Sequence, residues 1–221
     1  MAGRQGQPLS TSDSLTVAFC AELPPDGRFG GVEQNILGLL HALGEFDAGD
    51  RFIVTTLPSA PAWPAAVLGE NMRLRPIQAG WQERFMHQVR SRLAPGSKLR
   101  RAVRGSKRAF KPYAVPDGRA RYARLNADLV HFPFQWFART GLPSVYCPHD
   151  LQHVHLPELF DEVVIADREL LYGAGCREAT AVVVESEWVR QDIVSHFGVS
   201  RDRIFIIPTS APTSAYDGIT P

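Results

Sequence analysis

Short apolar runs alternate with amphipathic stretches along most of the chain. The runs are rich in β-branched and aromatic residues and cover 15–20, 51–57, 72–77, 127–132, 143–147, 181–184 and 203–207. Such runs are typical of strands buried in a parallel sheet. Apolar residues recur at helical spacing over 32–43 and 186–197, and in the second of these Ser186 and Gly198 are placed as N-terminal cap and C-terminal stop. We also expect a helix from about 167 to 179, before the run at 181–184. The alternation predicts an α/β fold, a doubly wound parallel sheet with helices on both faces.

A polar cluster follows directly on one of the predicted strands. From Ser144 to Glu158 the chain passes from a β-prone run through Pro148 into three histidines, an aspartate and a glutamate. Open parallel sheets bind ligands beyond the carboxyl ends of their strands, so this cluster is the first candidate for chemistry. A neutral His149 ring can accept from one hydroxyl group and donate to another, and Asp150 can fix which nitrogen does which. The alternative is that both residues only hydrogen-bond their own loop.

The same histidines raise the question of a metal. Imidazole is the commonest metal ligand, and His149, His153 and His155 lie close together in the sequence. Their spacing would need a helix for the first pair and a strand for the second, and Pro148 and Pro157 argue against one long regular element. Neither H-E-x-x-H nor G-x-S-x-G occurs in the chain. A metal-dependent hydrolase is therefore a rival interpretation, and we expect no metal.

The loop after the first predicted strand is rich in proline and glycine and ends in Gly30 and Gly31. Glycine lets the backbone approach a ligand closely, and the free N–H groups of the predicted helix that follows favour an anion such as a phosphate. The spacing is not that of the dinucleotide motif G-x-G-x-x-G, so a plain turn is the alternative.

Charge is distributed unevenly along the chain. The 221 residues are 44% hydrophobic, enough for a core, and carry a net charge of only +1. Residues 84–124 contain 13 of the 24 Lys and Arg but one of the 23 acids, so this segment carries about +12 and the remainder about −11. We predict two basic amphipathic helices here, able to bind an anionic membrane surface or a phosphate-bearing substrate, with solvated covering helices as the alternative. No motif that reads nucleic acid accompanies the charge.

Cysteine usage and the N-terminus bear on the compartment. The three cysteines are far apart and odd in number, which predicts no disulfide framework, and Cys20 and Cys147 end predicted strands as small buried hydrophobes. Residues 1–14 lack the apolar centre of a signal peptide, and no apolar run approaches eighteen residues. We expect a cytoplasmic protein.

Four sequence blocks together resemble a known family. They are GGVEQ with the apolar helix after it, ADLVHFPF, VYCPHDLQHVHLPELF and AVVVESEWVRQDIVSHFGVSRDRIFIIP. Their order and spacing over nearly all of residues 15–208 resemble the N-terminal half of a family 4 glycosyltransferase of the GT-B type. The resemblance implies a Rossmann-like domain that binds mostly acceptor, facing a second domain that binds mostly nucleotide. It also implies sugar transfer from a nucleotide-activated donor, with retention at the anomeric carbon and no metal ion.

The resemblance also implies roles for single residues. Gly30 and Gly31 would approach the donor phosphates or the sugar, His149 would lie at the reacting sugar, and Asp150 would support it. His153 would belong to the same substrate-binding set. Ser186 and Glu187 would line the cleft, although an N-terminal cap and a first-turn acid explain them equally well. Positioning and charge stabilisation are the roles expected of His149 in a retaining transfer.

The chain departs from the family pattern at its end. Relatives commonly have P-N-G after the last strand, where this chain has Pro208-Thr209-Ser210-Ala211. The sequence also lacks the C-terminal domain with its E-x7-E motif. We therefore expect a flexible N-terminus at 1–14, an acceptor-side domain at 15–208 with a basic helical insert at 84–124, and a linker at 209–221 toward a donor-binding domain in cis or in trans. The chain alone should transfer little or no sugar.

The leading hypothesis is thus the acceptor-binding domain of a retaining, nucleotide-sugar-dependent glycosyltransferase of hexosyltransferase type, acting in glycan or polysaccharide biosynthesis. Its acceptor would be a glycan or a lipid-linked molecule, and the basic insert would hold it at the inner face of a membrane. The alternative is a non-catalytic sugar- or anion-binding module that partners a separate catalytic chain.

Overall fold

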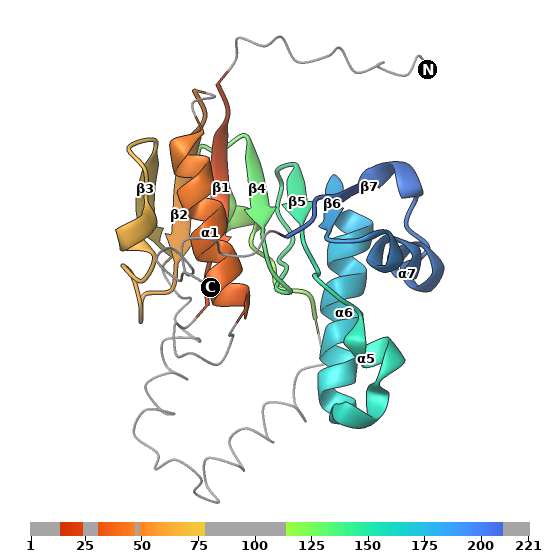
Figure 1. The fold of residues 1–221 in the computed structure, drawn as a ribbon. Helices are drawn as coiled ribbons and strands as arrows, with labels where there is room; N and C mark the ends of the chain where they lie inside the picture. Colours follow the sequence, from red (N-terminus) through yellow and green to blue (C-terminus); the bar gives the residue numbers. More distant parts are fainter. Residues whose placement is uncertain (1–13, 24–30, 47–48, 78–113, 210–221) are drawn as a thin grey trace, which may run out of the picture.

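The fold is built on one parallel sheet of seven strands in the order β3-β2-β1-β4-β5-β6-β7. A computed structural model describes residues 14–23, 31–46, 49–77 and 114–209. The strands are β1 (Thr16–Ala21), β2 (Arg51–Thr56), β3 (Met72–Pro76), β4 (Leu129–Phe132), β5 (Ser144–Tyr146), β6 (Ala181–Val184) and β7 (Ile204–Ile206). Figure 1 shows them side by side, with β1 at the point where the strand order reverses.

Helices cover the two halves of the sheet. The longer ones are α1 (Gly31–Glu45), α6 (Glu162–Glu178) and α7 (Glu187–Phe197), and the short ones are α4 (Arg119–Tyr122) and α5 (Gln152–His155). The chain moves in one direction along the sheet from β1 to β3 and in the other from β4 to β7. Because strand crossovers are right-handed, α1 covers one face, and α6 and α7 cover the other. Figure 1 shows α1 over β1 and β2, and α6 and α7 beside β6 and β7.

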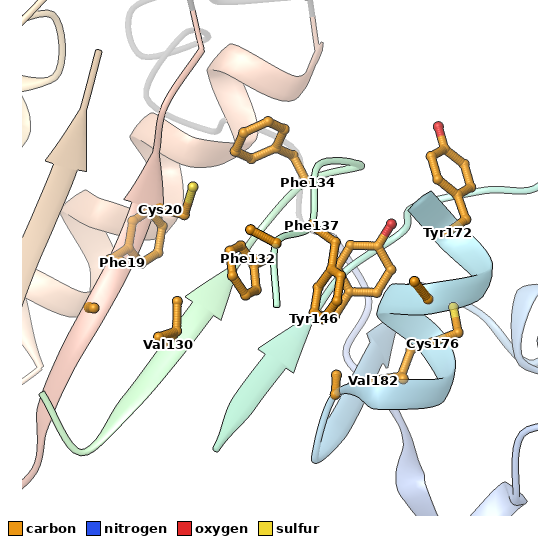
Figure 2. Packing of buried hydrophobic residues seen from close by; sticks show 14 of the residues in the cluster. Phe19, Cys20, Val130, Phe132, Phe134, Phe137, Tyr146, Tyr172, Cys176 and Val182 are labelled. Atoms are coloured by element: carbon orange, nitrogen blue, oxygen red, sulfur yellow. The ribbon is translucent and has the colours of Figure 1, made fainter. Parts of the chain in front are cut away.

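Aromatic rings fill the core between the middle strands and α6. The Phe137 ring lies edge-on to Phe132 and to Tyr146, with centroid distances of 5.2 Å and 5.5 Å. Figure 2 shows these rings between the ends of β4 and β5 and the helix that carries Cys176. Gly175 lets α6 come this close, because a Cβ there would lie 2.5 Å from the Tyr146 ring. The carboxyl ends of β4 and β5 are therefore held by tight packing.

The described structure agrees with the sequence-based strands to within one or two residues at most ends. Ser186 caps α7 by accepting a hydrogen bond from the Val189 N–H, and Gly198 follows the helix in the left-handed conformation, at φ +66°. The main difference is α6, which begins at Glu162 and not at 167 as expected. None of the described helices has the length and apolar character to cross a membrane.

Most of the predicted basic insert, and with it both of its predicted helices, lies outside the described residues. The described end of the segment contains α4 and a 3-10 turn at Ala123–Leu125. Tyr122 of α4 is fully buried against the core. This end of the segment is therefore part of the folded domain.

Candidate functional site

The candidate site lies where β5 and β6 end. These strands are parallel neighbours, and Tyr146 of β5 is paired with Val182 of β6. Cys147 follows β5, and Glu185 follows β6. Parallel neighbours end at the same edge of a sheet, so residues 36 positions apart meet there.

His149 lies at the centre of a tight turn beyond β5. The Asp150 N–H donates to the Pro148 carbonyl over 3.0 Å, which closes a three-residue turn around His149. The φ of His149 is +66°, in the left-handed region that non-glycine residues seldom adopt. That conformation costs on the order of 1–2 kcal/mol, and such strain is concentrated at functional sites.

The turn brings the His149 ring onto an acid and a thiol. Nδ1 of His149 lies 2.5 Å from Oε1 of Glu185, and the Cys147 sulfur lies 3.8 Å from Nδ1. The His149 side chain is only 14% exposed. Burial alone would lower the pKa of His149, but its contacts with Cys147 and Glu185 outweigh burial and raise that pKa to about 10. The ring is consequently an imidazolium at neutral pH.

The other ring nitrogen of His149 is buried and has no hydrogen-bond partner among the described residues. In an imidazolium both nitrogens carry a proton, and Nδ1 already donates to Glu185. Nε2 is left as an N–H donor whose bond is unmade, which costs free energy unless a ligand or water accepts it. The arrangement suits an oxygen acceptor such as a hydroxyl group or a phosphate.

The predicted supporter of His149, Asp150, has a different contact. Its carboxylate accepts a hydrogen bond from the Gln152 N–H at the start of α5, over 3.2 Å. Among the described contacts, it is Glu185 that supports the His149 ring, and sequence reasoning missed this residue. The one sequence signal for Glu185 is an acid directly after the most strand-like run of the chain.

The other two histidines of the cluster contact different carboxylates. His153 is buried, with Nε2 3.2 Å from Glu169 of α6, and Nε2 of His155 lies 2.7 Å from Asp192 of α7. The three rings therefore do not form one metal site of the kind that the rival interpretation required. The assignment of His153 to substrate binding stays a prediction, and its contacts tie α5 to α6.

Ser186 and Glu187, predicted to line the cleft, have structural partners. The Ser186 hydroxyl accepts from the Val189 N–H over 3.3 Å as the cap of α7. The exposed Glu187 carboxylate pairs with Arg190 and with Arg201, and hydrogen bonds from these two residues lower its pKa. These contacts hold the start of α7 beside the site. A contact of either residue with substrate would come in addition to them.

A comparison with protein families decides which family this is. Residues 29–214 match the model described as Glycosyltransferase Family 4. The chain belongs to glycosyltransferase family 4. Its parallel sheet with helices agrees with the Rossmann-like N-terminal half of a GT-B fold that the resemblance implied.

Two solved structures are similar to this family 4 chain. A glycosyltransferase from Rickettsia africae ESF-5 aligns with 95% of this chain and 47% of its own length, at 14% identity and a TM-score of 0.43. Anabaena Alr3699/HepE, solved in complex with UDP-glucose, aligns with 92% of this chain and 48% of its own length, at 12% identity and a TM-score of 0.42. The chain spans about half the length of each. No curated protein matches the sequence.

The family 4 chain carries a second polar cluster at the carboxyl end of β1, which sequence reasoning also missed. The Glu22 side chain is 3% exposed and lies 3.1 Å from Arg121. It accepts hydrogen bonds from Thr55 over 2.9 Å and from the Tyr122 hydroxyl over 3.0 Å. The Arg121 guanidinium also lies over the Trp136 ring, 5.1 Å from its centroid. This network ties α4 to the β1 end of the site edge.

The predicted glycine site of the family 4 chain consists of Gly30 and Gly31. Gly31 is the exposed first residue of α1, whereas Gly30 lies outside the described residues, so the predicted glycine site stays a prediction.

A hollow of about 320 Å³ is lined by the starts of β1, β2 and β3, among them Thr16, Phe52 and Met72. It opens at the amino edge of the sheet, opposite the edge where α/β folds bind ligands, and we assign it no role.

Proposed function

We propose that this chain is the acceptor-side domain of a retaining, nucleotide-sugar-dependent glycosyltransferase of hexosyltransferase type. Membership of glycosyltransferase family 4 supports the class of reaction. The observation that carries the proposal is the His149 ring, with Nδ1 held by Glu185 and the buried Nε2 left without a partner among the described residues. It lies at the sheet edge where ligands of α/β folds bind.

His149 would stabilise the charge that develops during transfer or fix the position of the reacting sugar. Sugar transfer from a nucleotide donor leaves negative charge on the departing phosphate, and a fixed N–H donor on a cation stabilises such charge. The same donor can instead hold a hydroxyl group of the sugar that reacts, which fixes its orientation. Because the imidazolium supplies positive charge within the domain, we propose that the transfer needs no metal ion.

The remaining parts of the site would bind substrate and partner. We propose Gly30, Gly31 and Ser186 as contacts to the donor phosphates or the sugar, with Asp150 and His153 holding the loop that carries His149. A donor-binding domain, in cis or in trans, would face this edge. The acceptor would be a glycan or a lipid-linked molecule in polysaccharide biosynthesis.

The membrane part of the proposal rests on charge. The segment 84–124 carries about +12, and each Lys or Arg near an anionic surface contributes roughly 1 kcal/mol of attraction. We propose a cytoplasmic protein held peripherally at the inner face of the membrane. Cosedimentation with phosphatidylserine vesicles at physiological salt should be substantial, and its absence would remove this part.

The activity test uses the full-length protein with a panel of nucleotide sugars and candidate acceptors, read as release of the nucleotide. His149→Asn is the informative variant, because asparagine tolerates the left-handed backbone at this position. His155→Asn is the matched control, since His155 pairs with Asp192 on the surface. We expect His149→Asn to lower turnover by about 100-fold to 1,000-fold and His155→Asn to leave it nearly unchanged.

The outcomes separate the candidate functions. Consumption of a nucleotide sugar that depends on His149 supports the glycosyltransferase. Tight binding of a sugar or an anion with no consumption of any donor would favour the non-catalytic binding module in its place. Equal turnover in the two histidine variants would overturn the role assigned to His149.

A further inference from the structure

We propose that Cys147, His149 and Glu185 form a binding site for a zinc-class divalent cation. The three residues are a thiol, an imidazole and a carboxylate from the adjacent ends of β5 and β6, and their candidate ligand atoms all lie within 4.8 Å of one another. No other such trio of His, Cys, Asp or Glu occurs in the described part of the chain. The proposal goes beyond sugar transfer and does not depend on it.

The distances between the three atoms are close to those around a zinc ion. The Cys147 sulfur lies 3.8 Å from Nδ1 of His149 and 3.9 Å from Oε1 of Glu185. A tetrahedral zinc with bonds of about 2.0–2.3 Å separates a sulfur and a nitrogen ligand by roughly 3.5 Å. Only the 2.5 Å between Nδ1 and Oε1 must widen, by under about 1 Å. Glu185 is 26% exposed, so its side chain has room to turn.

The set of donors favours a borderline-soft metal. Thiolate and imidazole together select zinc, cobalt or iron over magnesium and calcium, which prefer all-oxygen sites. Cys147 is buried, and His149 is nearly so, which places two of the three ligands away from competing water. Three protein ligands leave a fourth position open, as in zinc sites that also bind a water or a substrate atom.

The backbone conformation directs the His149 ring at the other two residues of the trio. His149 adopts a left-handed turn, and this turn points Nδ1 at Glu185 and Cys147. A site that is formed before binding loses little conformational entropy when the ligand arrives. A buried hydrophobic role for Cys147 would not require an acid and an imidazole beside the sulfur.

Binding would exchange protons for the metal. The thiol proton of Cys147 and the proton between His149 and Glu185 would leave to solvent as the cation takes their place. Nε2 of His149 keeps its proton, because only Nδ1 faces the trio. The donor that we assign to sugar transfer is therefore present with proton or metal at Nδ1, and the two proposals fail separately.

Cobalt binding to the full chain provides the test. The protein is stripped with chelator and titrated with Co²⁺ and then Zn²⁺, without donor or acceptor, and a thiolate-to-cobalt charge-transfer band is followed in the near ultraviolet. We expect about one equivalent of metal and a band that zinc abolishes. Cys147→Ser should remove the band, and Glu185→Gln should weaken binding by at least tenfold.

Two matched variants serve as controls. Cys176→Ala removes another buried thiol, and His155→Asn removes another imidazole of the same loop, and both should bind as the unchanged protein does. Circular dichroism establishes that each variant is folded, and Glu185→Gln, which changes no volume, provides the answer if Cys147→Ser does not fold. The absence of a charge-transfer band, or equal cobalt affinity in Glu185→Gln and the unchanged protein, would overturn the proposal.

Discussion

Glu185 lies 36 residues beyond His149 in the chain, yet its carboxylate oxygen is 2.5 Å from Nδ1 of the His149 ring. The contact exists because β5 and β6 are parallel neighbours that end at one edge of the sheet. It couples the protonation of the ring to the packing of two strands. The protonation state of His149 and the free energy of unfolding of the domain should therefore change together.

Glu185→Gln keeps the shape of the side chain but removes its negative charge. The pKa of His149 should fall below about 10, because burial then opposes protonation with less attraction against it, while the contact with Cys147 still raises the pKa. Titration of the His149 ring by NMR measures this directly. Asp192→Asn, which touches only the His155 pair, should leave the pKa of His149 where it is.

The same pair predicts how the stability of the domain depends on pH. A pKa that is raised in the folded state contributes stability that is fully present below about pH 6.5 and is lost as the pH rises through about 10. Because a tenfold change in proton affinity corresponds to about 1.4 kcal/mol, the loss across this window is on the order of a few kcal/mol. Urea unfolding from pH 6 to 10 should show this decline in the unchanged protein and a smaller decline in Glu185→Gln, in which only the contact with Cys147 still raises the pKa. Parallel curves would contradict the prediction.

Gly175→Ala should destabilise the domain. The new Cβ would lie 2.5 Å from the ring of the fully buried Tyr146, so helix α6 or the ring must shift. We expect a loss of roughly 1–3 kcal/mol in the free energy of unfolding. Gly38→Ala in α1 is the matched control, because beyond its chain neighbours and the backbone of its own helix no atom lies within 4 Å of its Cβ, and it should stabilise by about 0.5–1 kcal/mol. Similar effects at both positions would refute the packing argument.

Ser186→Ala should lower stability by about 1 kcal/mol, since the Val189 N–H loses its partner at the start of α7. Ser186→Asp supplies another side-chain oxygen at the cap and should restore the free energy of unfolding. Thermal unfolding of the three proteins measures the effect. If Ser186 also contacts substrate, Ser186→Asp will be stable but impaired in transfer, whereas a cap alone predicts full activity.

Arg121→Met should destabilise the domain far more than Arg119→Met, although the two arginines lie only two residues apart on α4. Arg121 pairs with the 3% exposed carboxylate of Glu22, and its removal leaves a buried charge without its cation. We expect a loss of roughly 2–3 kcal/mol in the free energy of unfolding. Arg119 pairs with Asp117 on the surface, and its replacement should have no measurable effect. Chemical denaturation of both variants compares them.

The parts of the fold that were predictable from sequence follow from local patterns. The run at 181–184 and the cap and stop of α7 each depend on a few adjacent residues, and the structure confirms them. The start of α6 at Glu162 was missed because this helix has no clear apolar stripe. Its buried residues are five consecutive positions, Tyr172 to Cys176, where Gly175 allows close packing on Tyr146 of the sheet.

From the sequence, the site could be predicted only to lie at this edge of the sheet. His149 was placed beyond a strand end by its neighbours in sequence, and the structure confirms that position. Its partner Glu185 follows β6, which comes after β5 both in the chain and in the sheet. The contact also depends on the register of the two strands and on the left-handed turn at His149, and no local sequence pattern specifies either of them. Asp150 was chosen because it is next in sequence, but it contacts the backbone at Gln152.

The strand order also bears on how the protein is made. In the finished sheet β1 lies between β2 and β4, but Val17 of β1 pairs with Phe52, 35 residues later, and with Leu129, 112 residues later. At translation rates of about 5–20 residues per second, β1 waits roughly 6–20 s for β4 to be synthesised. Throughout that interval one edge of an apolar strand has no partner. The first three strands are therefore the part of the nascent chain that most needs protection from aggregation on the ribosome.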